Sequence, residues 1–346
     1  MIHPKKILRI TLVASGIIGT LIFTPWQILR IWITPLPDSI QEQVQEATGS
    51  GLDGIIVYVD QRGKPPAFYA SGWMDKGNKI KVAPDALFKI ASISKLYLAV
   101  ATTKLVANSS LSLDDTLSGL LPELKSRIEN AGHITLRTLL THRSGIPDWI
   151  DDKAFPWDSP PKDVDDVLSL VFDDEANFQP DARYQYSNTN YLLIGKILDK
   201  TLGYGHQEYI KKEILDRLGL MHTYGSLSDA NPGKVMCGYD SHYEGDVKGL
   251  DFVSPSGAMV ATAEDVGIFL RALNDGSLLN DEEMNIYSSV YEFGHTGLLP
   301  GYMSIARYHK DIDSVVVQFV NTSGGNSWGK SETIYNRIVR ILRNAL

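Results

Sequence analysis

The sequence has little cysteine and no cluster of positive charge, and both absences restrict its function. Cys237 is the only cysteine among 346 residues, so the chain can form no internal disulfide and no cysteine-based metal site. The formal net charge is −8 and no long basic block occurs, which disfavours a nucleic-acid partner. The 8 histidines are scattered without an HExxH-type pair, so a metal is not indicated.

The first 34 residues read as a membrane anchor or a signal segment. Lys5, Lys6 and Arg9 precede an apolar run over residues 10–26, about as long as the roughly 17–25 residues of a membrane-spanning helix. No good cleavage site stands near residues 25–37. The pattern predicts an uncleaved transmembrane helix that anchors an extracytoplasmic, periplasmic-side body in the cytoplasmic membrane. Secretion after signal cleavage is the alternative.

Residues 38–346 are predicted to fold as one domain with strands near both ends. Runs rich in β-branched residues predict hairpins at 54–73 and 302–321, while most segments between residue 106 and about 220 read as helical. The economical arrangement is an α/β (α+β) fold. It has a mostly antiparallel sheet of early and late chain, flanked by helices, with a helical lobe inserted over about residues 105–250.

Ser92 and Lys95 stand three residues apart where an apolar helix is predicted to begin. This spacing places the amine and the hydroxyl on one helix face. A serine nucleophile needs a neighbour that takes its proton, and burial among apolar residues should lower the pKa of a lysine toward that of a useful base. Free N–H groups at the helix start would stabilise an oxyanion. Two other Ser-x-x-Lys matches, at 159–162 and 327–330, do not begin an apolar helix.

A second candidate motif is Tyr186 with Asn188, two residues further on. In an extended backbone the two side chains would point the same way. The phenol is a possible base or proton relay, and the amide a possible holder of a substrate carbonyl or amide. A core aromatic residue and a helix cap are the alternatives.

A third candidate motif is His295, Thr296 and Gly297 at the start of a late strand. The glycine would let a substrate approach the backbone closely, and the next N–H, that of Leu298, could be a second oxyanion donor. By itself His295 fits an ordinary polar residue as well as a catalytic one.

In this order the three motifs resemble the motif set of the penicillin-recognising serine hydrolases. The branch is that of class C β-lactamases, D-alanyl-D-alanine carboxypeptidases and family VIII-type esterases. Segments around the motifs are similar to the family as well, and the resemblance covers about residue 42 to the end. These segments are Leu139–Pro147, Phe178–Arg183, Pro255–Asp265 and Pro300–Tyr302.

The resemblance implies a β-lactamase/transpeptidase-like fold and an acyl-enzyme mechanism without metal or organic cofactor. Ser92 would attack a carbonyl, and Lys95 and Tyr186 would share the proton transfers, with the base left open between them. Asn188, together with His295, Thr296 and Gly297, would bind the substrate. The N–H groups of Ser92 and Leu298 would hold the oxyanion.

The expected substrate is a small molecule or peptide, with peptides that end in D-alanine or another D-amino acid first. Carboxylesterase, β-lactamase and a non-hydrolytic sensor of β-lactams or peptidoglycan are the alternatives. Many lactamases and carboxypeptidases have lysine where this chain has His295, and a lysine there attracts a substrate carboxylate. A histidine of ordinary pKa is mostly neutral at pH 7, so the sequence does not require an anionic substrate. It does not indicate an oligomeric state.

Overall fold

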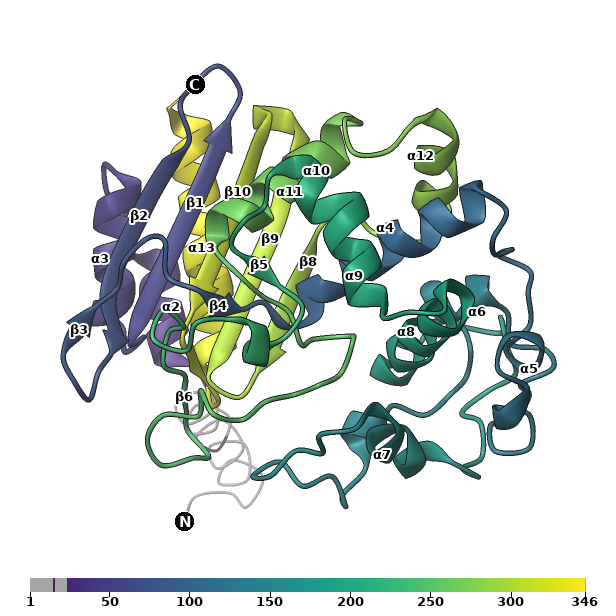
Figure 1. Cartoon of the computed structure of the whole chain (residues 1–346). Helices are drawn as coiled ribbons and strands as arrows, with labels where there is room; N and C mark the ends of the chain where they lie inside the picture. Colours follow the sequence, from purple (N-terminus) through teal and green to yellow (C-terminus); the bar gives the residue numbers. More distant parts are fainter. Residues whose placement is uncertain (1–14, 16–23, 346) are drawn as a thin grey trace, which may run out of the picture.

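A six-stranded antiparallel sheet forms the centre of the computed structural model, which describes residue 15 and residues 24–345 (Figure 1). In spatial order its strands are β3 (Ile80–Lys81), β2 (Ala67–Asp75), β1 (Gly54–Gln61), β10 (Ser314–Val320), β9 (Tyr302–His309) and β8 (His295–Leu299). Both predicted hairpins are present as β1–β2 and β9–β10. The β1–β10 pairing joins them, so the predicted sheet of early and late chain is confirmed.

Helices cover both faces of the sheet: α11 (Ala263–Asp275) packs on one face, and α3 (Ile40–Gly49) and α13 (Ser327–Asn344) pack on the other. α4 (Ser94–Ala107) extends beyond β8 and packs on other helices (Figure 1). Side chains alternate between the two faces along a strand, and β1 shows this directly. Ile56 and Tyr58 belong to the large core that includes α4 and α11. Ile55 and Val57 belong to a second core with α3 and α13. The sheet is therefore buried on both faces, and its central strands consist mainly of Val and Ile.

Further helices lie in the chain between the two halves of the sheet. They are α5 (Leu117–Leu120), α6 (Leu136–Leu140), α7 (Val164–Leu168), α8 (Asn188–Leu202), α9 (His206–Ile210) and α10 (Asp216–Leu218), with α12 (Asp281–Ser288) later in the chain. In Figure 1 α5–α8 gather on the right, beyond the edge strand β8. The exact bounds of the predicted lobe stay a prediction.

Two small sheets lie outside the six-stranded sheet. β4 (Phe88–Lys89), β7 (Val260–Ala261) and β5 (Thr223–Tyr224) form a three-stranded sheet, and β6 (Tyr239–Asp240) pairs with β11 (Thr322–Ser323). β4 leads directly into the segment of Ser92.

The expectation of an amino-terminal transmembrane helix is wrong for the residues that the structure describes. The helix there, α2 (Trp26–Ile33), has 8 residues and spans about 12 Å, whereas a bilayer core is about 30 Å thick. Among residue 15 and residues 24–345, no helix is long and apolar enough to cross a membrane. The remainder of the expected span, residues 10–14 and 16–23, lies outside the described residues.

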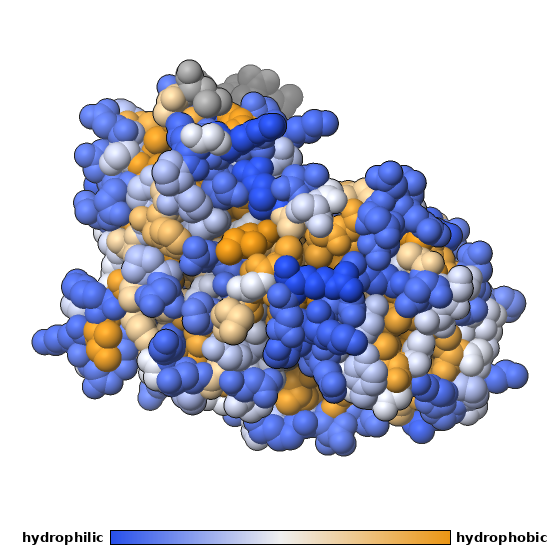
Figure 2. All heavy atoms as spheres, turned by 45° about the horizontal axis from the view of Figure 1, so that its top comes forward, coloured by the Kyte–Doolittle hydropathy of each residue, from blue (hydrophilic) through white to orange (hydrophobic). Residues whose placement is uncertain are grey.

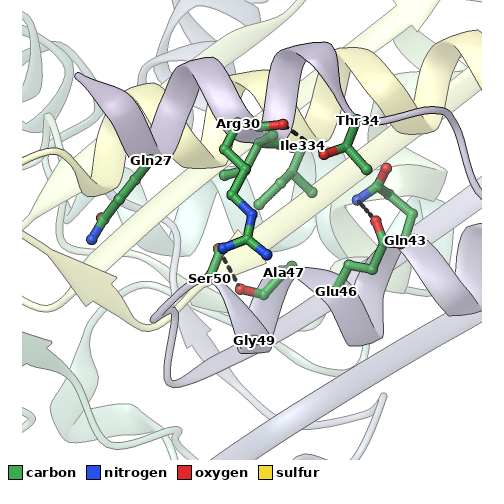
Figure 3. A pocket seen from close by; sticks show the side chains of 10 residues that line it. Gln27, Arg30, Thr34, Gln43, Glu46, Ala47, Gly49, Ser50 and Ile334 are labelled. Atoms are coloured by element: carbon green, nitrogen blue, oxygen red, sulfur yellow. Dashed lines mark hydrogen bonds between the residues drawn. The ribbon is translucent and has the colours of Figure 1, made fainter. Parts of the chain in front are cut away.

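α2 packs on the folded domain, which hydropathy alone does not reveal. Arg337 of α13 is 3% exposed and donates hydrogen bonds to the main-chain oxygens of Ile31, Thr34 and Pro35, at 2.8, 2.6 and 2.8 Å. These bonds satisfy carbonyls that a helix end otherwise leaves without partners. Figure 3 shows the Arg30 side chain extending from α2 toward α3 across a cavity of about 440 Å³.

Exposed hydrophobic side chains occur in small patches between hydrophilic ones on the face shown in Figure 2. Scattered exposure of this kind is ordinary for folded proteins and needs no functional explanation.

Candidate active site

Ser92 lies on a 3₁₀ turn, Ala91–Ile93, that runs into α4. The α-helix itself begins at Ser94, two residues later than the sequence predicts, but the turn keeps Lys95 next to Ser92. Ala91 has φ of +51°, in the left-handed region that residues other than glycine rarely adopt. Such strained backbone is found preferentially at functional sites, and here it directly precedes the candidate nucleophile.

Lys95 is fully buried and its amine contacts three oxygen atoms. Nζ lies 2.9 Å from Ser92 Oγ, 2.8 Å from Asn188 Oδ1 and 3.1 Å from the main-chain oxygen of Ser256. Burial lowers the pKa of Lys95 to about 7, and the negative charge of Asp148 partly opposes this effect. The amine is therefore available in its neutral form near pH 7.

Tyr186 supplies the second group at the Ser92 hydroxyl. Its OH donates to Ser92 Oγ at 3.2 Å. Burial raises the pKa of Tyr186, so the phenol keeps its proton at neutral pH. The ring stacks on His142, with 4.3 Å between ring centroids. Burial, then the charge of Lys95, lowers the pKa of His142 to about 3, so this support for Tyr186 is uncharged.

Asn188 is the first residue of α8, and its side chain does not cap the helix. Its Oδ1 accepts from Lys95, and its Nδ2 donates to Asp148 Oδ2 at 2.9 Å. Asp148 is 8% exposed, and burial raises its pKa. The amide thus connects a buried carboxylate with the buried lysine, and because its Nδ2 donates to Asp148, its oxygen faces Lys95.

Sequence reasoning missed Asp148 and Ser256. Asp148 follows directly after the family-like segment that ends at Pro147, and Ser256 lies within another such segment. Both residues therefore lie in or next to segments that the sequence singles out as similar to the family. The sequence does not show, however, that the carboxylate of Asp148 is buried. Ser256 contacts Lys95 through its main-chain oxygen, so the identity of its side chain does not reveal this contact.

The third motif lies beside this group, and its predicted role in substrate binding stays a prediction. Gly297 accommodates the protein's own backbone, because a Cβ there would lie 2.4 Å from the main-chain oxygen of Ile90 and 2.3 Å from Ser304 Oγ. His295 Nδ1 is hydrogen-bonded to the main-chain oxygen of Thr296. A carbonyl oxygen only accepts, so Nδ1 carries the proton. Burial, then Lys95, lowers the pKa of His295 to about 4, which makes this residue neutral at pH 7.

A cleft of about 550 Å³ opens at Ser92. Asn188 and Leu298 line it together with Ser92, which places the two predicted oxyanion donors at one site; their N–H roles stay a prediction. His295 and Tyr186 line a smaller pocket of about 180 Å³, while Thr296 and Gly297 line neither. Across residues 15 and 24–345, no group of three or more His, Cys, Asp or Glu side chains is placed to hold a metal ion.

Comparison with known proteins places this geometry in context. The family model described as Beta-lactamase matches residues 40–291. Protein flp of Staphylococcus aureus (strain N315) is 25% identical over 274 residues, which cover 75% of this chain and 55% of that protein. The chain thus spans about half the length of the curated relatives it matches.

Solved structures share the fold at low sequence identity. The D-amino acid amidase from Ochrobactrum anthropi SV3 is 23% identical with a TM-score of 0.77, covering 88% of this chain and 98% of its own. The penicillin binding protein from Bacillus halodurans is 22% identical with a TM-score of 0.72, covering 87% of this chain and 99% of its own.

Proposed function

Because the chain belongs to the beta-lactamase family of penicillin-recognising serine hydrolases, we propose that it hydrolyses amides of D-amino acids through an acyl-enzyme on Ser92. The observation that carries the proposal is the contact of Ser92 Oγ with both Lys95 Nζ, at 2.9 Å, and Tyr186 OH, at 3.2 Å. The likeness to a D-amino acid amidase and to a penicillin binding protein supports the substrate class.

Lys95 is the base in this proposal. A neutral amine has two N–H donors and one lone pair, and Asn188 Oδ1 and the Ser256 carbonyl accept the two N–H bonds. The lone pair then faces Ser92 Oγ and takes its proton as the oxygen attacks the substrate carbonyl. Tyr186 is a poor base because its pKa is raised by burial.

Tyr186 is the proton donor to the leaving group. After attack, the C–N bond of the amide breaks while the phenol protonates the departing nitrogen, and the ammonium of Lys95 restores the phenol's proton. The N–H groups of Ser92 and Leu298 stabilise the oxyanion. Water then attacks the ester in a second cycle, and Ser92 Oγ regains its proton.

Carboxylesterase activity is the second candidate, because the neutral His295 offers no positive charge to a substrate carboxylate. The same observation weakens the expectation of a D-alanyl carboxypeptidase, whose substrate ends in a free carboxylate. An extracytoplasmic location stays a prediction.

Active-site labelling tests the nucleophile. A fluorophosphonate or a fluorescent penicillin is expected to label the wild-type protein and Ser159→Ala, which removes the serine of another Ser-x-x-Lys sequence, but not Ser92→Ala. Turnover of D-alanine amide, L-alanine amide and p-nitrophenyl butyrate by the same three proteins then separates amidase from esterase. Labelling of folded Ser92→Ala at wild-type yield would refute the assignment of Ser92.

A further inference from the structure

We infer that the preferred substrate carries an aromatic or other bulky apolar group in its acyl portion and no carboxylate near the scissile bond. The inference rests on the proposed function, since it names the substrate class for the site at Ser92. It comes from the side chains that line the cleft beyond the reacting groups.

One wall of the cleft is aromatic. Trp149, Trp157 and Phe252 line it, and the ring of Trp157 neighbours the other two: it lies 6.3 Å from Trp149 and 6.0 Å from Phe252 between ring centroids. Trp149 and Phe252 are 5% and 7% exposed, so both are held firmly in the core. Trp157 is half-buried and spans the space between them.

Further apolar groups extend this surface toward the reaction centre. Ile150, Leu299 and Pro300 line the same cleft as Ser92. Its volume of about 550 Å³ falls in the range of small-molecule pockets, roughly 300–1,000 Å³, and far exceeds the needs of a methyl group. An aromatic acyl group would gain most by filling it, because aromatic pairs add to the free energy of burial.

No Lys or Arg lines the cleft among the described residues. Its titratable side chains are Asp158, Asp240 and His242, and His242 Nδ1 lies 2.8 Å from Asp240 Oδ1, so this ring is already paired with a carboxylate. Burial alone would raise the pKa of Asp240, but hydrogen bonds from Ser323 and His242 outweigh it and lower the pKa, so this group is an anion. The smaller pocket beside Tyr186 is likewise lined by Glu292 and by no described Lys or Arg.

Lys95 does not compensate for this lack of cations. It is 0% exposed, and its contacts with Ser92, Asn188 and Ser256 occupy the three hydrogen-bonding positions of its amine. A substrate carboxylate would lose its hydration without gaining an ionic partner, which disfavours its binding. A neutral or cationic substrate incurs no such loss.

A series of p-nitrophenyl esters with one leaving group isolates the acyl portion: acetate, butanoate, 3-phenylpropanoate and monosuccinate. Each kcat/KM is divided by the rate constant for hydrolysis of the same ester by hydroxide, which corrects for differences in intrinsic reactivity between the esters. We expect 3-phenylpropanoate to exceed acetate by at least about 10-fold, and monosuccinate to fall at least about 10-fold below butanoate.

Variants locate the preference. Trp157→Ala is expected to lower the ratio of 3-phenylpropanoate to acetate by about 5-fold or more, and Trp157→Phe to restore most of it. Tyr204→Ala, which removes an aromatic residue that is 41% exposed between α8 and α9, should keep the wild-type ratio. Circular dichroism and Tm of each variant show whether it is folded.

The outcomes separate the two claims. Equal corrected kcat/KM values across the series, or a folded Trp157→Ala with the wild-type ratio, would overturn the aromatic preference and leave the hydrolase assignment intact. Monosuccinate turned over as fast as butanoate would overturn the charge argument. No turnover of any ester or amide, with no labelling of Ser92, would overturn the proposed function and this inference with it.

Discussion

The charge of Asp148 offers the sharpest test of how the site tunes its base. Asp148→Asn removes a buried negative charge but keeps an oxygen that can accept the hydrogen bond from Asn188 Nδ2. Without that charge the ammonium form of Lys95 loses a stabilising partner, so the pKa of Lys95 falls below its value of about 7. The acidic limb of kcat/KM, which reports this base in the free enzyme, then moves to lower pH.

The size of the shift follows from the hydrogen-bonded path. Lys95 Nζ to Asn188 Oδ1 is 2.8 Å and Asn188 Nδ2 to Asp148 Oδ2 is 2.9 Å, with one amide group between. The path along these bonds is about 8 Å long, so the two charges are at most about 8 Å apart. At an effective dielectric constant of about 20 their attraction is then roughly 2 kcal/mol or more. That free energy moves the midpoint of the limb by about 1.5 pH units, since one pH unit corresponds to about 1.4 kcal/mol.

The assay is the pH dependence of kcat/KM between about pH 4 and pH 9 on p-nitrophenyl butyrate. The wild type is expected to lose activity below a midpoint near pH 7, and Asp148→Asn below a midpoint near pH 5.5. Asp151→Asn removes an exposed carboxylate three residues away and should follow the wild type. A folded Asp148→Asn whose profile coincides with that of the wild type would refute the coupling.

Two further substitutions test the neighbours of Ser92. Tyr186→Phe removes the proton donor and should lower kcat/KM for D-alanine amide, whose nitrogen must be protonated to leave, by about 10²–10⁴-fold while the acidic limb stays near pH 7; a limb that disappears would make Tyr186 the base instead. Gly297→Ala places a Cβ 2.4 Å from the Ile90 carbonyl, so urea unfolding should show a loss of about 1–3 kcal/mol together with reduced activity. Gly249→Ala, with no atom within 4 Å of the new Cβ, is the control and should change neither.

The sheet was predictable because its determinants are local. Alternation and β-branched runs lie within single strands such as β1 and β10, and each hairpin is closed by a short turn. The prediction of a transmembrane helix before residue 34 was wrong because it ignored contacts that are distant in sequence. Hydropathy cannot show that Arg337, about 300 positions later, binds the carbonyls at the end of α2.

The candidate site was predictable where side chains act at fixed spacing. The structure joins the two motifs by hydrogen bonds, from Tyr186 to Ser92 and from Lys95 to Asn188, and Lys95 also contacts Ser92. The contacts of Lys95 with the main chain of Ser256 and of Asn188 with Asp148 join distant segments, and no motif in the sequence indicates them. The choice between Lys95 and Tyr186 as base depends on burial, which the motifs do not encode.

Burial of the site lowers the pKa of Lys95, and it also leaves His295 without the positive charge that could bind a substrate carboxylate. Removing water from around Lys95 lowers its pKa to about 7, and removing it from around His295 lowers that pKa to about 4. Each cation also disfavours the other, because Lys95 itself lowers the pKa of His295. A lysine at position 295 would stand as a second cation in this buried group, and the ammonium of Lys95 would be destabilised further. With histidine there, the pKa of Lys95 stays near 7, and under our proposal the aromatic side chains around Trp157 select the substrate.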